Sequence, residues 1–227
     1  MAHREFKDAL YGQFARVGAA LSSQKRLEIL DLLAQAPRHV EALARETDMS
    51  VANVSQHLHV LGQARLIEST REGTRVVYRL GDESVLRLWM CLRGVGEQRL
   101  ADVRALAEDY GLDSESDLEL ETGRGLVREG RAVLVDVRPA HEYEHGHLPE
   151  AISLPIEELP LRIDELPRDR RILAYCRGAY CLFADEAVRL LSERGYDAVR
   201  LADGWSEYRA SLLVGSGPRR DAVGAEH

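Results

Sequence analysis

The residues most capable of chemistry are two cysteines, Cys176 and Cys181, with only four residues between them. An apolar run at 171–175 precedes them and a helical run at 182–191 follows, so the pattern predicts a strand that ends in a tight loop and opens a helix. Backbone N–H groups and the positive end of a helix favour a thiolate. We therefore expect the pKa of Cys176 to be lowered and its sulfur to be the reactive one.

The second thiol gives this loop two alternative interpretations. If Cys176 is oxidised or persulfidated, Cys181 can attack it and form a disulfide or a trisulfide, which would make the pair a switch. Alternatively, Cys181 is a small apolar residue packed at the start of the helix. The guanidinium of Arg177 is a candidate for holding an anion beside the pair.

The segments around the loop alternate between strand and helix patterns. Short apolar runs predict strands at 133–137, 151–154, 172–175 and 198–201, with helical segments between them. Continuous apolar strands joined through helices are typical of a small α/β domain with a parallel sheet.

The first half of the chain has a different pattern. Apolar spacing predicts helices at 4–21, 24–35, 40–47 and 51–64, then a hairpin of strands 66–70 and 74–80 around a turn at 71–73, and one long helix at 82–109. This order predicts a mainly α-helical winged helix-turn-helix domain whose fourth helix enters a DNA major groove. The candidate base contacts are Ser50, Asn53, Ser55, Gln56 and His59, and the candidate phosphate or minor-groove contacts on the wing are Arg71 and Arg75.

Composition is consistent with two domains in 227 residues. We expect domains at 1–110 and 118–213, a linker at 111–117 and a flexible tail at 214–227. The formal net charge of −8 comes wholly from residues 113–227, so the first half is neutral and can still present a basic face to DNA. We find no apolar stretch long enough to span a membrane and no secretory leader, and we expect a cytoplasmic protein with no membrane partner.

The first half resembles the ArsR family of winged-helix repressors. The resemblance covers roughly residues 10–105 and is carried by residues 50–51, 54–58, 60–61, 66–67, 72–73 and 76–80. It implies a homodimer that binds operator DNA, with the first and last long helices packed across the two-fold axis. Many relatives hold a metal through a Cys-x-Cys pair before the recognition helix, but residues 39–48 contain no cysteine, so we expect no metal and no cofactor. His57 fits a packing role, and we expect Cys91 to be a buried structural thiol on the dimer helix.

The second half resembles a single-domain rhodanese over roughly residues 117–212. The carrying segments are 134–138, 142–152, the Cys176 loop and 201–205. The resemblance implies that Cys176 is the nucleophile, that Asp136 and Arg138 brace its loop, and that His147 is structural. The family usually has an anion-binding residue where this chain has Cys181, which argues against efficient thiosulfate turnover.

Together these features predict a dimeric transcriptional repressor that senses reactive sulfur species or thiophilic oxidants through Cys176 and Cys181. One alternative is a sulfurtransferase or thiol-dependent reductase tethered to DNA, which thiosulfate and cyanide turnover would reveal. The other is a sensor of As(III) or another soft metal held by the two thiolates, which metalloid-dependent DNA release without an oxidant would reveal.

Overall fold

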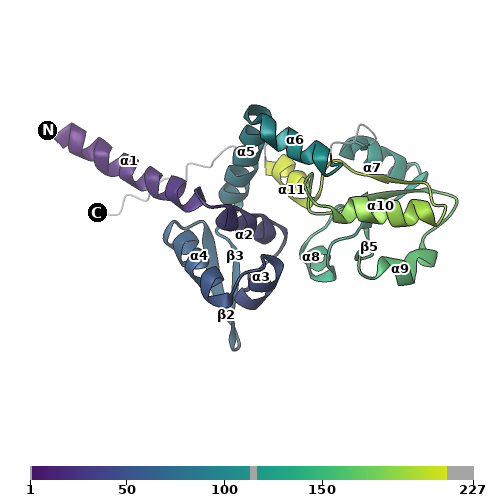
Figure 1. Ribbon diagram of the computed structural model, residues 1–227, viewed down its shortest axis with the longest axis horizontal. Coiled ribbons are helices and arrows are strands. Elements are labelled where there is room, and N and C mark those ends of the chain that lie inside the picture. The colour runs from purple at the N-terminus through teal and green to yellow at the C-terminus, as the bar shows by residue number, and fades with distance from the viewer. Residues whose placement is uncertain (1, 113–116, 214–227) are drawn as a thin grey trace, which may run out of the picture.

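The computed structural model describes residues 2–112 and 117–213, which form two bodies lying side by side (Figure 1). The N-terminal body is helical with a small antiparallel sheet, and the C-terminal body has a parallel sheet covered by helices, as the sequence predicts. Residues 113–116 of the expected linker and the expected tail, 214–227, lie outside the described residues.

The helices of the N-terminal body pack around a core of aliphatic side chains. Ile29, Leu43 and Leu58 are buried because apolar residues recur at three- and four-residue spacing on the inner faces. Ser50 caps the fourth helix as predicted, since its Oγ accepts a hydrogen bond from the Asn53 N–H at 3.3 Å. The helices are α1 (Ala2–Leu21), α2 (Gln24–Gln35), α3 (Val40–Glu46) and α4 (Val51–Gln63).

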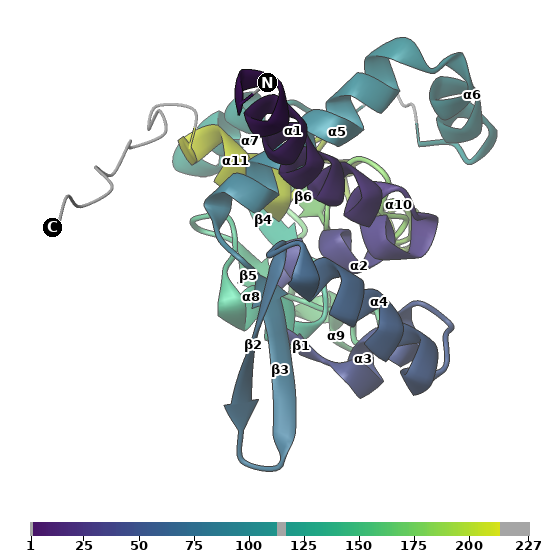
Figure 2. The same cartoon turned by 90° about the vertical axis from the view of Figure 1, so that its left-hand side faces the viewer.

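The wing is a hairpin that projects beyond the helices (Figure 2). The strands are β1 (Arg38–His39), β2 (Ile67–Glu72) and β3 (Arg75–Leu80), in the order β1-β3-β2. Pairing continues to Glu72 and Arg75, so the turn is narrower than the predicted 71–73. It can close in two residues because Gly73 adopts a φ of +61°. The sequence pattern did not predict β1, which is too short to show a period.

The predicted single helix at 82–109 is wrong. The structure has α5 (Glu83–Arg99) and α6 (Ala101–Asp109), separated by Leu100 in an extended conformation with φ −106° and ψ 108°. Gly94 and Gly96 weaken the last turns of α5. Leu100 itself is 57% exposed, so no packing compensates for that weakness.

The C-terminal body contains a sheet whose described strands all run parallel. Its strands are β4 (Ala132–Asp136), β5 (Ile152–Ser153), β6 (Arg171–Tyr175) and β7 (Ala198–Arg200), in the order β5-β4-β6-β7. The predicted parallel sheet is confirmed. Its helices are α7 (Leu120–Arg128), α8 (Ala140–His145), α9 (Leu159–Arg162), α10 (Phe183–Glu193) and α11 (Trp205–Leu213), with a 3₁₀ turn, η1, at Ile163–Glu165.

The parallel sheet brings the chemically interesting residues to one edge. β4 and β6 are neighbours, with Asp136 opposite Tyr175, so the segments after both strands emerge together. In α/β sheets this carboxyl edge is where ligands usually bind. Here it faces the N-terminal body, because α11 packs against α2 and α5 (Figure 1). None of the helices in the described residues is long and apolar enough to cross a membrane.

Candidate functional site: a thiol pair at the domain interface

The two cysteines of the loop have different environments. Cys176 follows the last residue of β6 and is only 3% exposed, because its side chain packs in the core beside Ala184 and Leu154. Its Sγ lies 3.2 Å from the Cys181 carbonyl oxygen. Cys181 is partly exposed just before α10. The two thiols also contact each other, with Cys176 as the hydrogen-bond donor to the Cys181 sulfur.

This geometry reverses the predicted acidity of the pair. Burial raises the pKa of Cys176, and its hydrogen bond to Cys181 raises it further, so the expected low pKa at Cys176 is wrong. The hydrogen bond from Cys176 lowers the pKa of Cys181 to about 7, with help from the N–H groups of Arg177 and Phe183. Both shifts favour a thiolate on Cys181 over one on Cys176.

Arg177 ties the loop to both domains through partly buried ion pairs. Its Nη2 lies 2.6 Å from Glu142 Oε1 on α8 and 3.0 Å from Glu46 Oε2 at the end of α3. Arg38 of β1 pairs with Glu46 at 3.0 Å and also contacts Glu142, so two guanidinium groups and two carboxylates form a closed ring across the interface. Such a ring holds its members in one arrangement because breaking any link leaves a buried charge poorly compensated.

A single buried amide joins three segments of the C-terminal body to the N-terminal body. Gln35, the last residue of α2, is fully buried. Its Nε2 donates to the Arg177 carbonyl at 3.1 Å and to Ser206 Oγ at 2.6 Å, and its Oε1 accepts from Arg138 Nη1 at 3.1 Å. The loop backbone is therefore fixed to the helix that precedes the helix-turn-helix.

Asp136 and Arg138 form a buried brace at the neighbouring strand end. Arg138 Nη2 lies 2.6 Å from Asp136 Oδ2, and the Tyr175 hydroxyl donates to the same oxygen at 2.6 Å. The brace reaches the loop through Tyr175 and Gln35. His147 stacks on Tyr143 with ring centroids 3.8 Å apart, a packing arrangement that matches its expected structural role.

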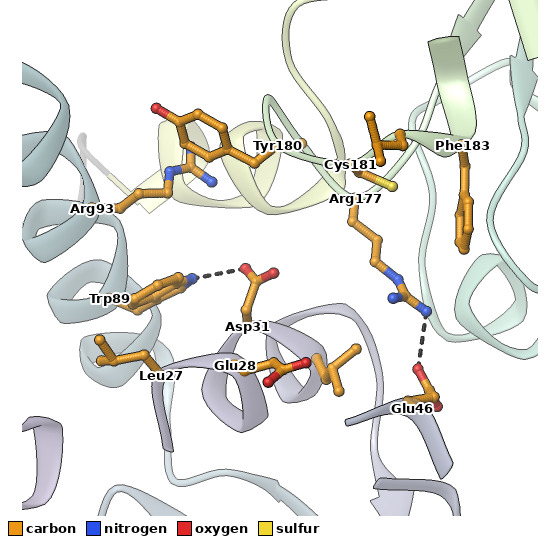
Figure 3. A pocket seen from close by; sticks show the side chains of 13 residues that line it. Leu27, Glu28, Asp31, Glu46, Trp89, Arg93, Arg177, Tyr180, Cys181 and Phe183 are labelled. Atoms are coloured by element: carbon orange, nitrogen blue, oxygen red, sulfur yellow. Dashed lines mark hydrogen bonds and ion pairs between the residues drawn. The ribbon is translucent and has the colours of Figure 1, made fainter. Parts of the chain in front are cut away.

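A cavity of about 490 Å³ lies between the two bodies and opens next to Cys181 (Figure 3). Leu27, Trp89 and Phe183 supply apolar walls. Asp31 lies on the floor, where burial raises its pKa and the Trp89 indole N–H donates to it at 2.9 Å. The cavity is therefore bounded by residues from both domains and lies against one thiol of the pair.

The candidate DNA contacts lie far from the thiols along the chain. Ser50, Asn53, Ser55, Gln56 and His59 are exposed on or next to α4, and Arg71 and Arg75 are exposed on the wing. Ser55 Oγ donates to the Val51 carbonyl at 2.8 Å, and the His59 ring lies 2.9 Å from Gln63, whereas the side chain of Gln56 is exposed on the same helix. The fold gathers these groups on α4 and the adjoining wing (Figure 2).

Sequence reasoning missed the interface residues Gln35, Arg38, Glu46 and Glu142. Glu142 belongs to a segment that carries the rhodanese resemblance, and Gln35 is a polar residue at the end of an apolar helix face; these were the only signals. Cys91 is exposed on α5 in the single chain, so its expected burial on the dimer helix stays a prediction.

The comparisons with known proteins agree with this architecture. Residues 23–69 match the model of the bacterial regulatory protein arsR family, and residues 120–211 match the rhodanese-like domain. The chain is 47% identical over 213 residues to the HTH-type transcriptional regulator Rv0324 of Mycobacterium tuberculosis, covering 93% of this chain and 94% of that protein.

Two further similarities cover one domain each. A sulfurtransferase of Allochromatium vinosum is 36% identical over 67 residues, which is 30% of this chain and 61% of that protein. A solution structure of the homodimeric winged helix-turn-helix DNA-binding domain of Mb0332 from Mycobacterium bovis is 46% identical, covers 42% of this chain and 89% of that one, and has a TM-score of 0.41.

Proposed function

Since the chain belongs to the ArsR family of DNA-binding transcriptional regulators and carries a C-terminal rhodanese-like domain, we propose that it is a repressor controlled by reactive sulfur at its thiol pair. One observation carries this proposal. Arg177, next to Cys176, is ion-paired at 3.0 Å with Glu46, the last residue of α3 in the helix-turn-helix. A change at the thiols therefore acts directly on the element that positions the recognition helix.

The coupling follows from the geometry of a disulfide. Linking Cys176 to Cys181 replaces their hydrogen bond with a covalent bond of about 2.05 Å and a restricted torsion angle. Arg177 lies between the two cysteines in the chain, so its guanidinium cannot keep the same position relative to Glu46 and Glu142 when the loop contracts. A coupling free energy of about 1–3 kcal/mol changes operator affinity by roughly 5–150-fold.

The proposed regulator is a homodimer. Phe6, Tyr11 and Phe14 on α1 are 60–66% exposed, and Val95 and Leu100 near the end of α5 are also exposed. Large apolar side chains exposed together on a helix are typical of a subunit interface. The first and last long helices of the N-terminal body are therefore the surfaces expected to meet across a two-fold axis.

The proposed DNA contacts are the exposed polar residues of α4 and the two wing arginines. The side-chain amide of Gln56 lies in the second turn of α4, where it can form two hydrogen bonds to the major-groove edge of an adenine. Arg71 and Arg75 lie on the hairpin, where guanidinium groups would reach phosphates or the minor groove. Both surfaces lie on the N-terminal body, away from the interface with the rhodanese-like domain (Figure 1).

Operator binding measured with and without a sulfane-sulfur donor tests the proposal. An operator is first selected from random duplex DNA by the purified protein, and its affinity is then measured by fluorescence anisotropy. We expect an alkyl hydropersulfide to reduce the affinity by 5–150-fold and dithiothreitol to restore it. An affinity that stays constant while mass spectrometry shows the thiols fully modified would refute the proposal.

A matched pair of variants tests the coupling route. Glu46→Gln removes the charge that faces Arg177, whereas Glu41→Gln changes an exposed glutamate on the same helix. We expect Glu46→Gln to reduce the response to sulfur and Glu41→Gln to respond as the unmodified protein does. Equal responses would show that the Arg177–Glu46 ion pair does not carry the signal.

The same assay separates the two alternatives. Release by As(III) under reducing conditions, without any sulfane-sulfur donor, would favour soft-metal sensing over sulfur sensing. Sustained production of thiocyanate from thiosulfate and cyanide would favour an enzyme.

A further inference from the structure

The two thiols differ in their access to the interdomain cavity. Cys181 and Arg177 line it, whereas Cys176 is 3% exposed and packs in the core of the C-terminal body. Gly204 packs against the backbone of the same loop, since a Cβ on it would lie 2.4 Å from the Cys176 carbonyl oxygen. A sulfur donor that enters the cavity therefore meets Cys181 first.

We propose that the interdomain cavity is the effector site and that Cys181, rather than Cys176, accepts the effector's sulfur. This inference rests on the proposed function and reverses the order of reaction that the rhodanese resemblance implies. Cys176 is then the resolving thiol. The acidity of the pair supports this order, because the hydrogen bond from Cys176 lowers the pKa of Cys181 to about 7, which makes a large fraction of Cys181 thiolate at neutral pH.

The reaction with a hydropersulfide, RSSH, balances in two steps. In the first, the Cys181 thiolate attacks the outer sulfur, the S–S bond of the donor breaks, and RS⁻ leaves as Cys181 becomes a persulfide. In the second, Cys176 loses its proton and attacks Cys181 Sγ, and the outer sulfur leaves as HS⁻, which takes up that proton. The two cysteines are oxidised to a disulfide, and the sulfane sulfur is reduced to hydrogen sulfide.

The charges around the cavity disfavour a dianionic donor. Glu28, Asp31 and Glu46 line it. Of the arginines among its described lining residues, Arg177 is paired with Glu142 and Glu46, and Arg93 lies 2.6 Å from Glu207. The carboxylates in the wall repel an anion, and the arginines of the wall are already paired with carboxylates. Entry of a dianion such as thiosulfate is therefore unfavourable. The cavity is therefore better suited to a small hydropersulfide with an apolar substituent, which carries at most one negative charge, than to thiosulfate.

The position of Arg177 makes the order of reaction directly measurable. Trypsin cleaves after Arg177, so Cys176 and Cys181 fall on different peptides. The full-length protein is mixed with an alkyl hydropersulfide, quenched with an alkylating reagent at successive times, digested and analysed by mass spectrometry. We expect the early persulfide on the Cys181 peptide in at least tenfold excess, followed by a disulfide that joins the two peptides.

Three cysteine variants extend this assay. Cys176→Ser should accumulate the Cys181 persulfide, Cys181→Ser should react at least tenfold more slowly, and Cys91→Ser should behave as the unmodified protein because Cys91 lies on α5 outside the cavity. Early persulfide on the Cys176 peptide of the unmodified protein would overturn the proposal, whatever the variants do.

The donor class is tested with thiosulfate in place of the hydropersulfide. We expect thiosulfate to modify Cys181 at least tenfold more slowly, and the double variant Glu28→Gln/Asp31→Asn to narrow that difference. Equal rates for the two donors would contradict the charge argument. The assays keep the two proposals distinct. If Cys181 is modified first but operator affinity does not change, sulfur control of DNA binding is refuted. If Cys176 is modified first and operator affinity is lost, only the proposed order of reaction is refuted.

Discussion

Gln35→Leu should uncouple the two domains. The substitution keeps a side chain of similar size but removes the amide that bonds the Arg177 carbonyl, Ser206 Oγ and Arg138 Nη1. A hydrogen bond to a charged group contributes about 1.5–3 kcal/mol and a neutral one about 0.5–1.5 kcal/mol. Because all these groups are buried at the interface, we expect the loss to destabilise the docked arrangement by about 3 kcal/mol, which is roughly a hundredfold change in the docking equilibrium.

Differential scanning calorimetry measures this loss. We expect the unmodified protein to unfold in one transition, because the domains support each other, and Gln35→Leu to show two separated transitions with the first at a lower temperature. Gln24→Leu is the matched control, since Gln24 is an exposed glutamine at the other end of α2. If the Gln35→Leu and Gln24→Leu thermograms coincide, the amide does not hold the interface and the reasoning is wrong.

Four further predictions concern DNA binding and the titrating groups. Gln56→Ala should weaken specific operator binding by about 1–3 kcal/mol in anisotropy titrations while leaving binding to random DNA unchanged; a uniform loss on all sequences would exclude a base contact. Arg75→Ala should weaken binding to all sequences alike and reduce the slope of log affinity against log salt by about 1, and an unchanged slope would remove it from the phosphate contacts. Alkylation of Cys181 should titrate with a midpoint near pH 7, and Cys176→Ala should move that midpoint upward because the donated hydrogen bond is lost; a midpoint that stays in place would contradict the pairing. Burial acts to raise the pKa of Glu46, but Arg38 and Arg177 outweigh it and hold the value below 4.5. The ion pairs of Glu46 should therefore stabilise the protein fully above pH 4.5, and this stabilisation should be lost as the pH falls through the folded-state pKa. Calorimetry at stepped pH measures this loss.

The position of the thiol pair suggests how a domain of the rhodanese type serves a regulator. The carboxyl edge of its sheet lies against the helix-turn-helix domain, so the loop that carries the cysteines is itself part of the interface. Tyr180 of the same loop lies over the Arg93 guanidinium of α5 at 5.9 Å. The loop therefore contacts α2, α3 and α5, which is the route by which the proposed covalent change would reach the DNA-binding element.

Local sequence determined most elements of both domains, but not β1 or the break between α5 and α6. The order of apolar and polar residues along the chain shows which face of each element is buried. It does so in the apolar runs of β4 and β6 and in the three- and four-residue spacing of α2 and α4. Ser50 as a helix cap and Gly73 in the wing turn are also local, because each depends on the backbone within a few residues. The order of these elements was enough to predict a winged helix-turn-helix followed by a parallel α/β domain.

Only the tertiary structure decided which thiol is acidic and what the loop touches. Gln35 and Arg177 are 142 positions apart in the chain, and Arg177 and Glu46 are 131 positions apart, so no local pattern connects them. The pKa of a thiol depends on how much solvent is removed from it and on which donors face it. The sequence placed Cys176 and Cys181 in one loop between a strand and a helix, but the packing of the folded core buries Cys176 and leaves Cys181 at the cavity.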